Sequence, residues 1–125
     1  MEVENVAAYN ALSRVLTGLG KYPQALLQAQ KSLKLDPSQA EMFVHAGEIL
    51  LRMGREQEAE MSFLKALQVN NYLVSGYQDL ITLYSNQVDT GKLMNILSRY
   101  YGILPPRSRE AQEIADRLQK LKSER

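Results

Sequence analysis

The sequence contains no cysteine, a single histidine and only four prolines among its 125 residues. The absence of cysteine excludes disulfide frameworks, thiol nucleophiles and cysteine-ligated zinc or iron–sulfur sites. One histidine without cysteine cannot make a histidine-rich or cysteine–histidine metal cluster. We therefore expect neither a metal nor another cofactor. The chain is long enough to bury a core without such a staple.

An excess of one charge is also absent, because 15 basic residues face 14 acidic ones and leave a formal net charge of +1. The two signs are interspersed, so no strong field attracts nucleic acid or an anionic membrane. No apolar run approaches the roughly 18 residues of a transmembrane helix, and the first residues are acidic where a signal peptide starts basic. We expect no nucleic-acid partner and no membrane insertion. The compartment stays unknown: cytoplasmic by default, or periplasmic if the chain is a fragment of a larger protein.

Catalytic patterns are missing as well. His45 has Glu41 and Glu48 at helical spacing, a set that could bind a metal adventitiously, but we favour an ordinary groove or surface residue that contacts a ligand. Gly91 and Lys92 stand at an expected helix start, yet the rest of the phosphate-loop pattern fails on both sides of them. No Ser-His-Asp or equivalent arrangement is evident. We predict that this chain is not an enzyme.

What the sequence does contain is a fixed repeat period. Leu35, Val69 and Ile103 are equally spaced and are followed by Asp-Pro, Asn-Asn and Leu-Pro-Pro, which are typical of helix ends. Apolar and small residues recur between these ends at the spacing of one helix face, and a constant period of this length indicates stacked helix hairpins. The aligned sets are Tyr9, Phe43 and Tyr77; Leu12, Ala46 and Leu80; Ala25, Ala59 and Leu93; and Ala29, Phe63 and Leu97.

The expected elements are all helices. Gly20 and Gly54 fit tight turns inside two hairpins, because glycine adopts the left-handed conformation that commonly closes a helix. Ser38 and Glu41 fit a capping box at the start of the third helix. The predicted helices cover residues 6–19, 22–35, 39–53, 56–69, 73–86, 90–102 and 108–122.

These repeats resemble the tetratricopeptide repeat family. The first copy carries signature residues at Tyr9, Leu12, Gly20, Tyr22, Ala25, Ala29, Leu33 and Pro37. The second carries them at Phe43, Ala46, Gly47, Leu50, Gly54, Ala59, Phe63 and Ala66. The third copy is degenerate, because bulky residues replace the family's small ones at Ile81, Val88, Leu93 and Tyr100.

The resemblance implies an all-α fold, a right-handed α-solenoid of about three antiparallel helix-hairpin repeats with a C-terminal capping helix. It implies one domain over residues 1–125, with repeats at about 6–39, 40–73 and 74–106. Residues 107–125 form the capping helix, whose apolar stripe and mixed polar face suit the end of a stack.

The resemblance also implies a protein–protein interaction module, an adaptor or scaffold that binds a protein or peptide segment in a concave groove. The first helix of each pair lines that groove in the family. One subgroup clamps acidic chaperone tails with basic and amide residues, but Asp79 has the wrong sign for such a clamp. The groove residues carried onto this chain are Asn10, Arg14, Thr17, Glu41, Val44, His45, Glu48, Arg52, Ser75, Gln78, Asp79 and Thr82.

Three alternatives stay open. The same fold could serve as a non-catalytic regulatory or substrate-positioning appendage of a larger enzyme or membrane-associated assembly. The last helix could bind a partner or a membrane surface instead of capping the third repeat. The first repeat, with Tyr9 and Leu12 partly uncovered at its end, could pair two copies of the chain into a homodimer.

Overall fold

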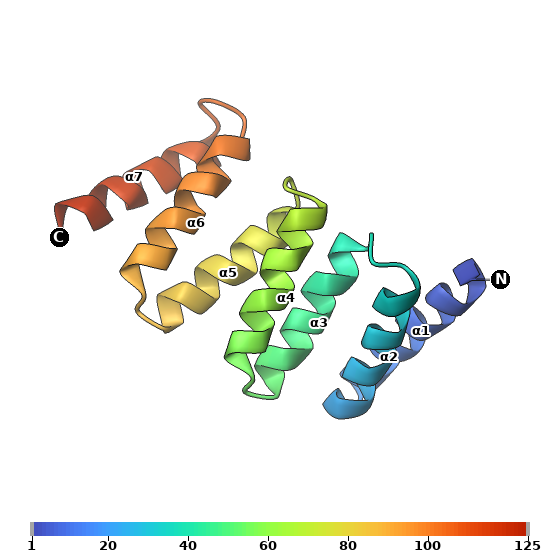
Figure 1. Cartoon of the computed structure of the whole chain (residues 1–125). Helices are drawn as coiled ribbons and strands as arrows, with labels where there is room; N and C mark the ends of the chain where they lie inside the picture. The colour runs from blue at the N-terminus through green and yellow to red at the C-terminus, as the bar shows by residue number, and fades with distance from the viewer. Residues whose placement is uncertain (1, 125) are drawn as a thin grey trace. The chain divides into compact units, whose positions relative to one another are not determined.

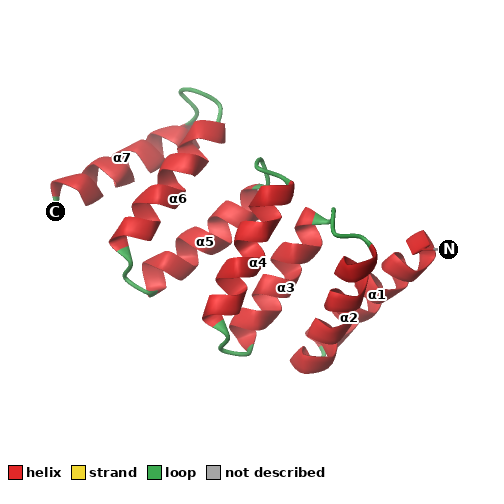
Figure 2. Cartoon of the chain, viewed as in Figure 1, coloured by secondary structure: helices red, strands yellow, loops and turns green. Residues whose placement is uncertain are grey.

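The computed structural model describes residues 2–124, with side chains from residue 5 onward. Every regular element in this part of the chain is a helix, and short loops join the helices (Figure 2). The all-α helical-repeat fold is therefore as predicted, although α1 begins earlier than expected. The helices are α1 (Glu2–Gly18), α2 (Tyr22–Leu35), α3 (Ala40–Arg52), α4 (Glu56–Val69), α5 (Val74–Asn86), α6 (Thr90–Ile103) and α7 (Arg109–Ser123).

The chain divides into two compact units, Met1–Gly76 and Tyr77–Arg125, which we call unit 1 and unit 2. Unit 1 contains α1 to α4, and unit 2 contains most of α5 together with α6 and α7 (Figure 1). The single domain expected over residues 1–125 stays a prediction.

The core of unit 1 is built from helix hairpins that approach closely. Ala25, Ala29 and Ala59 are completely buried and let paired helices come together. In the α3–α4 hairpin, a Cβ atom added to Gly47 would lie 2.5 Å from the ring of Phe63, which is also completely buried. The phenyl ring thus occupies the space that the missing side chain leaves.

The hairpin turns confirm the expected glycines and add a third position. Gly20 and Gly54 have φ angles of 75° and 76°, in the left-handed region that favours glycine. Val88, which stands one repeat period after Gly54, adopts a φ of 56°. A β-branched residue in this region is strained. The repeat geometry therefore imposes the same backbone turn even where the sequence no longer supplies glycine.

The predicted capping box at Ser38 and Glu41 is wrong. Ser38 turns back to Asp36, whose carboxylate accepts hydrogen bonds from the Ser38 amide at 3.0 Å and from its hydroxyl. These bonds also lower the pKa of Asp36. Gln39 precedes α3 and makes no side-chain cap. Asp36, two residues upstream, therefore competes successfully for the hydroxyl that a capping box needs.

The core of unit 2 uses larger residues. The buried rings of Tyr77 on α5 and Tyr100 on α6 stack with their centroids 5.2 Å apart. The α7 helix packs against α6, and its buried residues are Ala111 and Leu118. Ser108 caps its start by accepting a bond of 3.1 Å from the Ala111 amide. This packing fits the expected capping helix.

Candidate functional site

Serine and threonine side chains on α1 face α3 at the spacing of one helix face. Ser13 and Thr17 both lie within reach of His45, whose Nε2 atom is 3.2 Å from the Ser13 hydroxyl and 3.4 Å from the Thr17 hydroxyl. The Ser13 hydroxyl donates to the Ala25 carbonyl at 2.9 Å, and the Thr17 hydroxyl donates to the Ser13 carbonyl at 2.8 Å. Because both hydroxyl protons are used, Nε2 of His45 carries the proton and donates.

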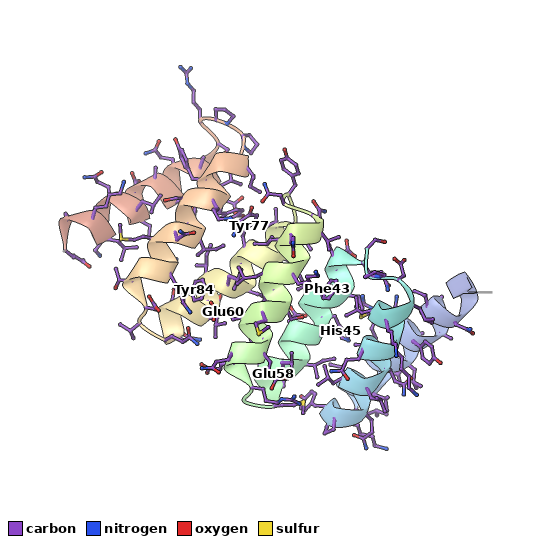
Figure 3. All side chains as sticks on the ribbon, in the orientation of Figure 1. Phe43, His45, Glu58, Glu60, Tyr77 and Tyr84 are labelled. Atoms are coloured by element: carbon purple, nitrogen blue, oxygen red, sulfur yellow. The ribbon has the colours of Figure 1, made fainter. Side chains whose placement is uncertain are left out.

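The electrostatics around His45 favour its neutral form. Burial lowers the pKa of His45, the positive charge of Arg14 lowers it further, and Glu48 partly opposes the shift. His45 is 9% exposed as a residue. Figure 3 shows its position on α3. The sequence predicted a groove or surface residue here, whereas the structure places a nearly buried imidazole between two repeats.

A second polar cluster links the middle of α1 and the last turn of α2 to the residue before α3, and we call it the polar joint. The side-chain nitrogen of Asn10 donates to the side-chain oxygen of Gln39 at 2.8 Å. The side-chain oxygen of Asn10 accepts a hydrogen bond from the Ser32 hydroxyl. Gln39 donates to the Ser32 hydroxyl at 3.0 Å and to the Asp36 carbonyl at 2.8 Å. Both ends of the Asn10 amide are therefore engaged inside unit 1.

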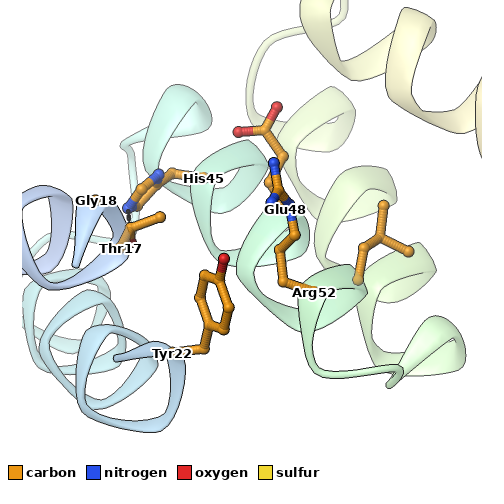
Figure 4. A pocket seen from close by; sticks show the side chains of 7 residues that line it. Thr17, Gly18, Tyr22, His45, Glu48 and Arg52 are labelled. Atoms are coloured by element: carbon orange, nitrogen blue, oxygen red, sulfur yellow. Dashed lines mark hydrogen bonds between the residues drawn. The ribbon is translucent and has the colours of Figure 1, made fainter. Parts of the chain in front are cut away.

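A pocket of about 490 Å³ opens beside His45 (Figure 4). This volume lies within the roughly 300–1,000 Å³ that is usual for ligand sites. The Tyr22 ring enters the pocket from α2, opposite the side chains of α3. The lining residues are Thr17, Gly18, Tyr22, His45, Glu48, Leu51 and Arg52.

Opposite charges flank this pocket one helical turn apart. Glu48 and Arg52 are both exposed on α3. Among the side chains that the structure describes, from residue 5 to 124, neither forms an ion pair or hydrogen bond with another residue. The two charged groups are consequently available to a ligand.

The predicted site residues fall into three groups. The structure brings four of them together at the pocket: Thr17, His45, Glu48 and Arg52. Four others lie elsewhere in unit 1: Asn10 in the polar joint, Arg14 and Glu41 exposed, and Val44 buried at 5% exposure. Ser75 is half-buried on α5 at the end of unit 1, while Gln78, Asp79 and Thr82 lie on the part of α5 that belongs to unit 2.

Sequence reasoning missed three lining residues, Gly18, Tyr22 and Leu51. The sequence marks Tyr22 only as a repeat signature, because the expected groove is lined by the first helix of each pair and Tyr22 begins a second helix. Leu51 stands between Glu48 and Arg52 in a run of apolar residues, and nothing in its sequence context marks it.

Neither a metal site nor a membrane span emerges from residues 2–124. Nowhere in this range do three or more histidine or acidic side chains converge as metal ligands would. Likewise, no helix in this range has the length and apolar character needed to cross a membrane.

Comparison with known proteins bears on the repeat architecture. Residues 40–72 match the family model described as tetratricopeptide repeat. A curated relative, the TPR repeat-containing protein YpiA of Bacillus subtilis, is 25% identical over 101 residues, which cover 79% of this chain. The match covers only 24% of that relative, so the chain spans about a quarter of its length.

Solved structures share the fold at low sequence identity. The TPR domain of Arabidopsis OM64 has a TM-score of 0.76 at 17% identity, with 96% of this chain and 98% of that chain covered. The first TPR of Spaghetti (RPAP3), bound to the HSP90 peptide SRMEEVD, has a TM-score of 0.73 at 16% identity, with 96% and 94% covered. The TPR2B domain of yeast Sti1, in complex with an Hsp70 peptide, has a TM-score of 0.77 at 15% identity, with 98% and 99% covered. Together with the repeat period and the helix hairpins, these matches show that residues 40–72 resemble a tetratricopeptide repeat and that the chain has the fold of tetratricopeptide repeat domains.

Proposed function

We propose that this chain is a non-catalytic interaction module that holds a segment of a partner protein in the pocket between α1, α2 and α3. The observation that carries the proposal is the combination of a pocket of ligand size with two opposite, uncommitted charges, Glu48 and Arg52. Peptides are recognised by such a mixture of apolar space and charge-assisted hydrogen bonds.

Two structural relatives support a peptide ligand. The matched domains of Spaghetti and Sti1 were each solved with a chaperone peptide. The ligand of this chain is expected to differ in charge, because an acidic and a basic side chain flank its pocket together. The preferred segment carries a basic residue for Glu48, an acidic residue for Arg52 and an apolar side chain between them for Tyr22 and Leu51.

A second role keeps the same site and changes its context. The chain matches a quarter of a longer relative, which favours a module acting beside other parts of one protein. In that role, the module is a regulatory or substrate-positioning appendage, and the pocket binds a segment of the same polypeptide or of its assembly. The adaptor and appendage roles therefore make the same prediction for the pocket.

The test exchanges the two charges by Glu48→Arg together with Arg52→Glu, which leaves the net charge unchanged. Peptides selected from a random display library by the wild type are then titrated against both proteins by calorimetry. We expect the exchange to weaken binding at least tenfold, about 1.4 kcal/mol. Hydrogen exchange should show protection by the peptide in α1 and α3.

The matched control exchanges a second i,i+4 pair, Arg109 and Glu113, which lie 3.2 Å apart and exposed on α7. This exchange preserves both net charge and ion pairing, and we expect unchanged peptide affinity. Equal affinity of the pocket variant and the wild type, or protection confined to unit 2, would place binding elsewhere.

The other partner that the sequence predicts is a second copy of this chain. It concerns a different surface, the side of α1 that faces away from α3.

A further inference from the structure

Four large apolar side chains are exposed on the first helix hairpin. Leu12, Val15 and Leu19 on α1 are 45%, 59% and 65% exposed, and Leu27 on α2 is 50% exposed. The α1 residues follow one another at intervals of three and four positions, so they form a stripe along one face of the helix. We call these four residues the α1 patch.

The fourth residue of the patch, Leu27, stands on the neighbouring helix at the level of Leu12. The ammonium group of Lys31 lies 5.7 Å from the centre of the Tyr9 ring, which fixes how α2 runs beside α1. In an antiparallel pair, Leu27, one turn before Lys31, lies beside the turn of α1 that follows Tyr9. That turn contains Leu12, so Leu27 extends the stripe sideways.

No charged residue interrupts this face of α1 between residues 5 and 19. The other exposed residues on it are small or neutral: Asn5, Ala8 and Ala11. Small side chains let a second helix approach closely, and a neutral face brings no like charges together when it meets its own copy. The exposed side of α7 is the opposite case, with Gln112, Asp116 and Gln119 among its residues.

We propose that two copies of this chain pair through the α1 patch across a twofold axis, with the two α1 helices antiparallel. A twofold interface places the same patch on itself, so its neutrality makes it self-complementary. The polar exposed side of α7 does not match an apolar partner, which disfavours head-to-tail association and open filaments.

The area of the patch sets the strength of the dimer. Four side chains that are about half exposed offer on the order of 400 Å² per copy, about half of the roughly 800 Å² per partner in a standard interface. We therefore expect a weak dimer, with a dissociation constant of roughly 10–100 μM, which lies in the range of transient association.

The dimer leaves the ligand pocket open. Thr17, which lines the pocket, is on the opposite side of α1 from Val15, because two helical positions differ by about 200°. Two pockets per dimer bind a repeated or multivalent partner more tightly than one pocket does, through an increased effective concentration. The pairing thus adds avidity to the proposed function without depending on it.

The first test is sedimentation equilibrium of the wild type over about 1 μM to 1 mM, a range that spans the expected dissociation constant. The mass should rise from the 14.2 kDa of one chain toward twice that value. Val15→Glu should weaken pairing at least tenfold, so its mass should lie below that of the wild type at each concentration where the wild type pairs. Met61→Glu is the control, because Met61 on α4 is 71% exposed but lies outside the patch, and it should pair as the wild type does.

A second variant keeps the patch apolar and uses the absence of cysteine in the chain. Val15→Cys places a thiol near the twofold axis and should form a disulfide-linked dimer under mild oxidation, while Met61→Cys should not. The proposal would be overturned by a wild type that keeps the mass of one chain at the highest concentration, with Val15→Cys linking no faster than Met61→Cys. The patch would then bind a partner other than a second copy of this chain. Equal pairing by wild type and Val15→Glu would also overturn it.

Discussion

The α3–α4 hairpin of unit 1 and the α5–α6 hairpin of unit 2 solve the same packing problem with opposite residue choices. In the first, Gly47 has no side chain, and the ring of Phe63 fills the space beside its backbone. At the equivalent positions of the next repeat stand Ile81, which is half-buried, and Leu97, which is completely buried. One helix geometry is thus compatible with different pairs, provided that the total volume is kept.

The two hairpins also differ at their turns. Gly54 closes α3 at no conformational cost, whereas Val88 adopts the same left-handed backbone with strain. Asp89 then caps α6 by accepting a bond of 3.0 Å from the Lys92 amide, while α4 begins at Arg55 without any side-chain cap. Unit 2 therefore compensates for a poor turn residue with a better helix start.

The largest expected effect breaks the complementary pair of unit 1. Gly47→Ala forces a Cβ atom against the completely buried ring of Phe63, so the free energy of unfolding of unit 1 should fall by about 1–3 kcal/mol. Urea denaturation, with hydrogen exchange read separately for α3 and α4, measures the loss.

The matched control is Gly102→Ala on α6, where an added Cβ meets nothing within 4 Å. This variant should gain about 0.5–1 kcal/mol, because alanine favours the helix. Adding Phe63→Leu to Gly47→Ala moves unit 1 toward the pair of unit 2 and should cost less than the two single changes combined. A Gly47→Ala protein as stable as the wild type contradicts the comparison.

The next effect concerns the start of α6, which has a side-chain cap, whereas the start of α4 has none. Asp89→Ala removes the acceptor for the Lys92 amide and should destabilise unit 2 by about 1 kcal/mol. Asp89→Asn retains an acceptor oxygen and should stay close to the wild type. Thermal unfolding of the three proteins separates a lost cap from a lost charge, since both variants remove the charge.

A smaller effect, of opposite sign in the two hairpins, comes from the turns. Val88→Gly should stabilise unit 2 by about 0.5–1 kcal/mol, because glycine relieves the left-handed strain. The greater flexibility of glycine in the unfolded chain offsets part of this gain. Gly54→Ala, with open space around its Cβ, should destabilise unit 1 by about 1 kcal/mol through its φ angle. Two changes of the same sign in chemical denaturation would show that the turns are not equivalent.

The last effects depend on pH, at opposite ends of the scale. Burial lowers the pKa of His45 below its ordinary 6.5, so the unfolded chain binds the proton more readily and unit 1 should lose stability as the pH falls below about 6.5. Burial raises the pKa of Tyr100 to about 12, so unit 2 should lose stability as the pH rises from about 10 to 12.

Unfolding followed by hydrogen exchange at each pH assigns the loss to a unit. His45→Gln should abolish the loss of unit 1 stability just below pH 6.5, and Tyr100→Phe should abolish the alkaline dependence of unit 2. An acid loss that persists in His45→Gln would mean that another group titrates there.

Most of the architecture followed from the sequence because it depends on period and spacing. The helices of residues 2–124, the turn glycines and the start of α7 at Ser108 all reflect local rules that recur along the chain. The turn at Val88 was also within reach, since it stands one period after Gly54. The capping box at Ser38 failed because two local motifs competed for one hydroxyl, and sequence alone does not rank them.

The site was predicted less completely, because its residues come from three helices. Spacing along α3 correctly grouped His45, Glu48 and Arg52, but only packing of α1 on α3 decides that His45 is nearly buried. Val44, one position before His45, illustrates the same limit. It faces the core, and its Cγ2 atom would lie 3.8 Å from a Cβ atom added to Gly76. Helical position fixes direction, while tertiary contacts fix exposure.

The polar joint has a mechanical consequence. Apolar helix faces can slide over one another with little change in energy, but hydrogen bonds between Asn10, Ser32 and Gln39 hold only at one offset and one angle. The joint therefore resists sliding between α1, α2 and the segment that leads into α3. A force applied along α1 should displace the helix little until the hydrogen bonds of the polar joint break. The width of the neighbouring pocket should stay constant until then.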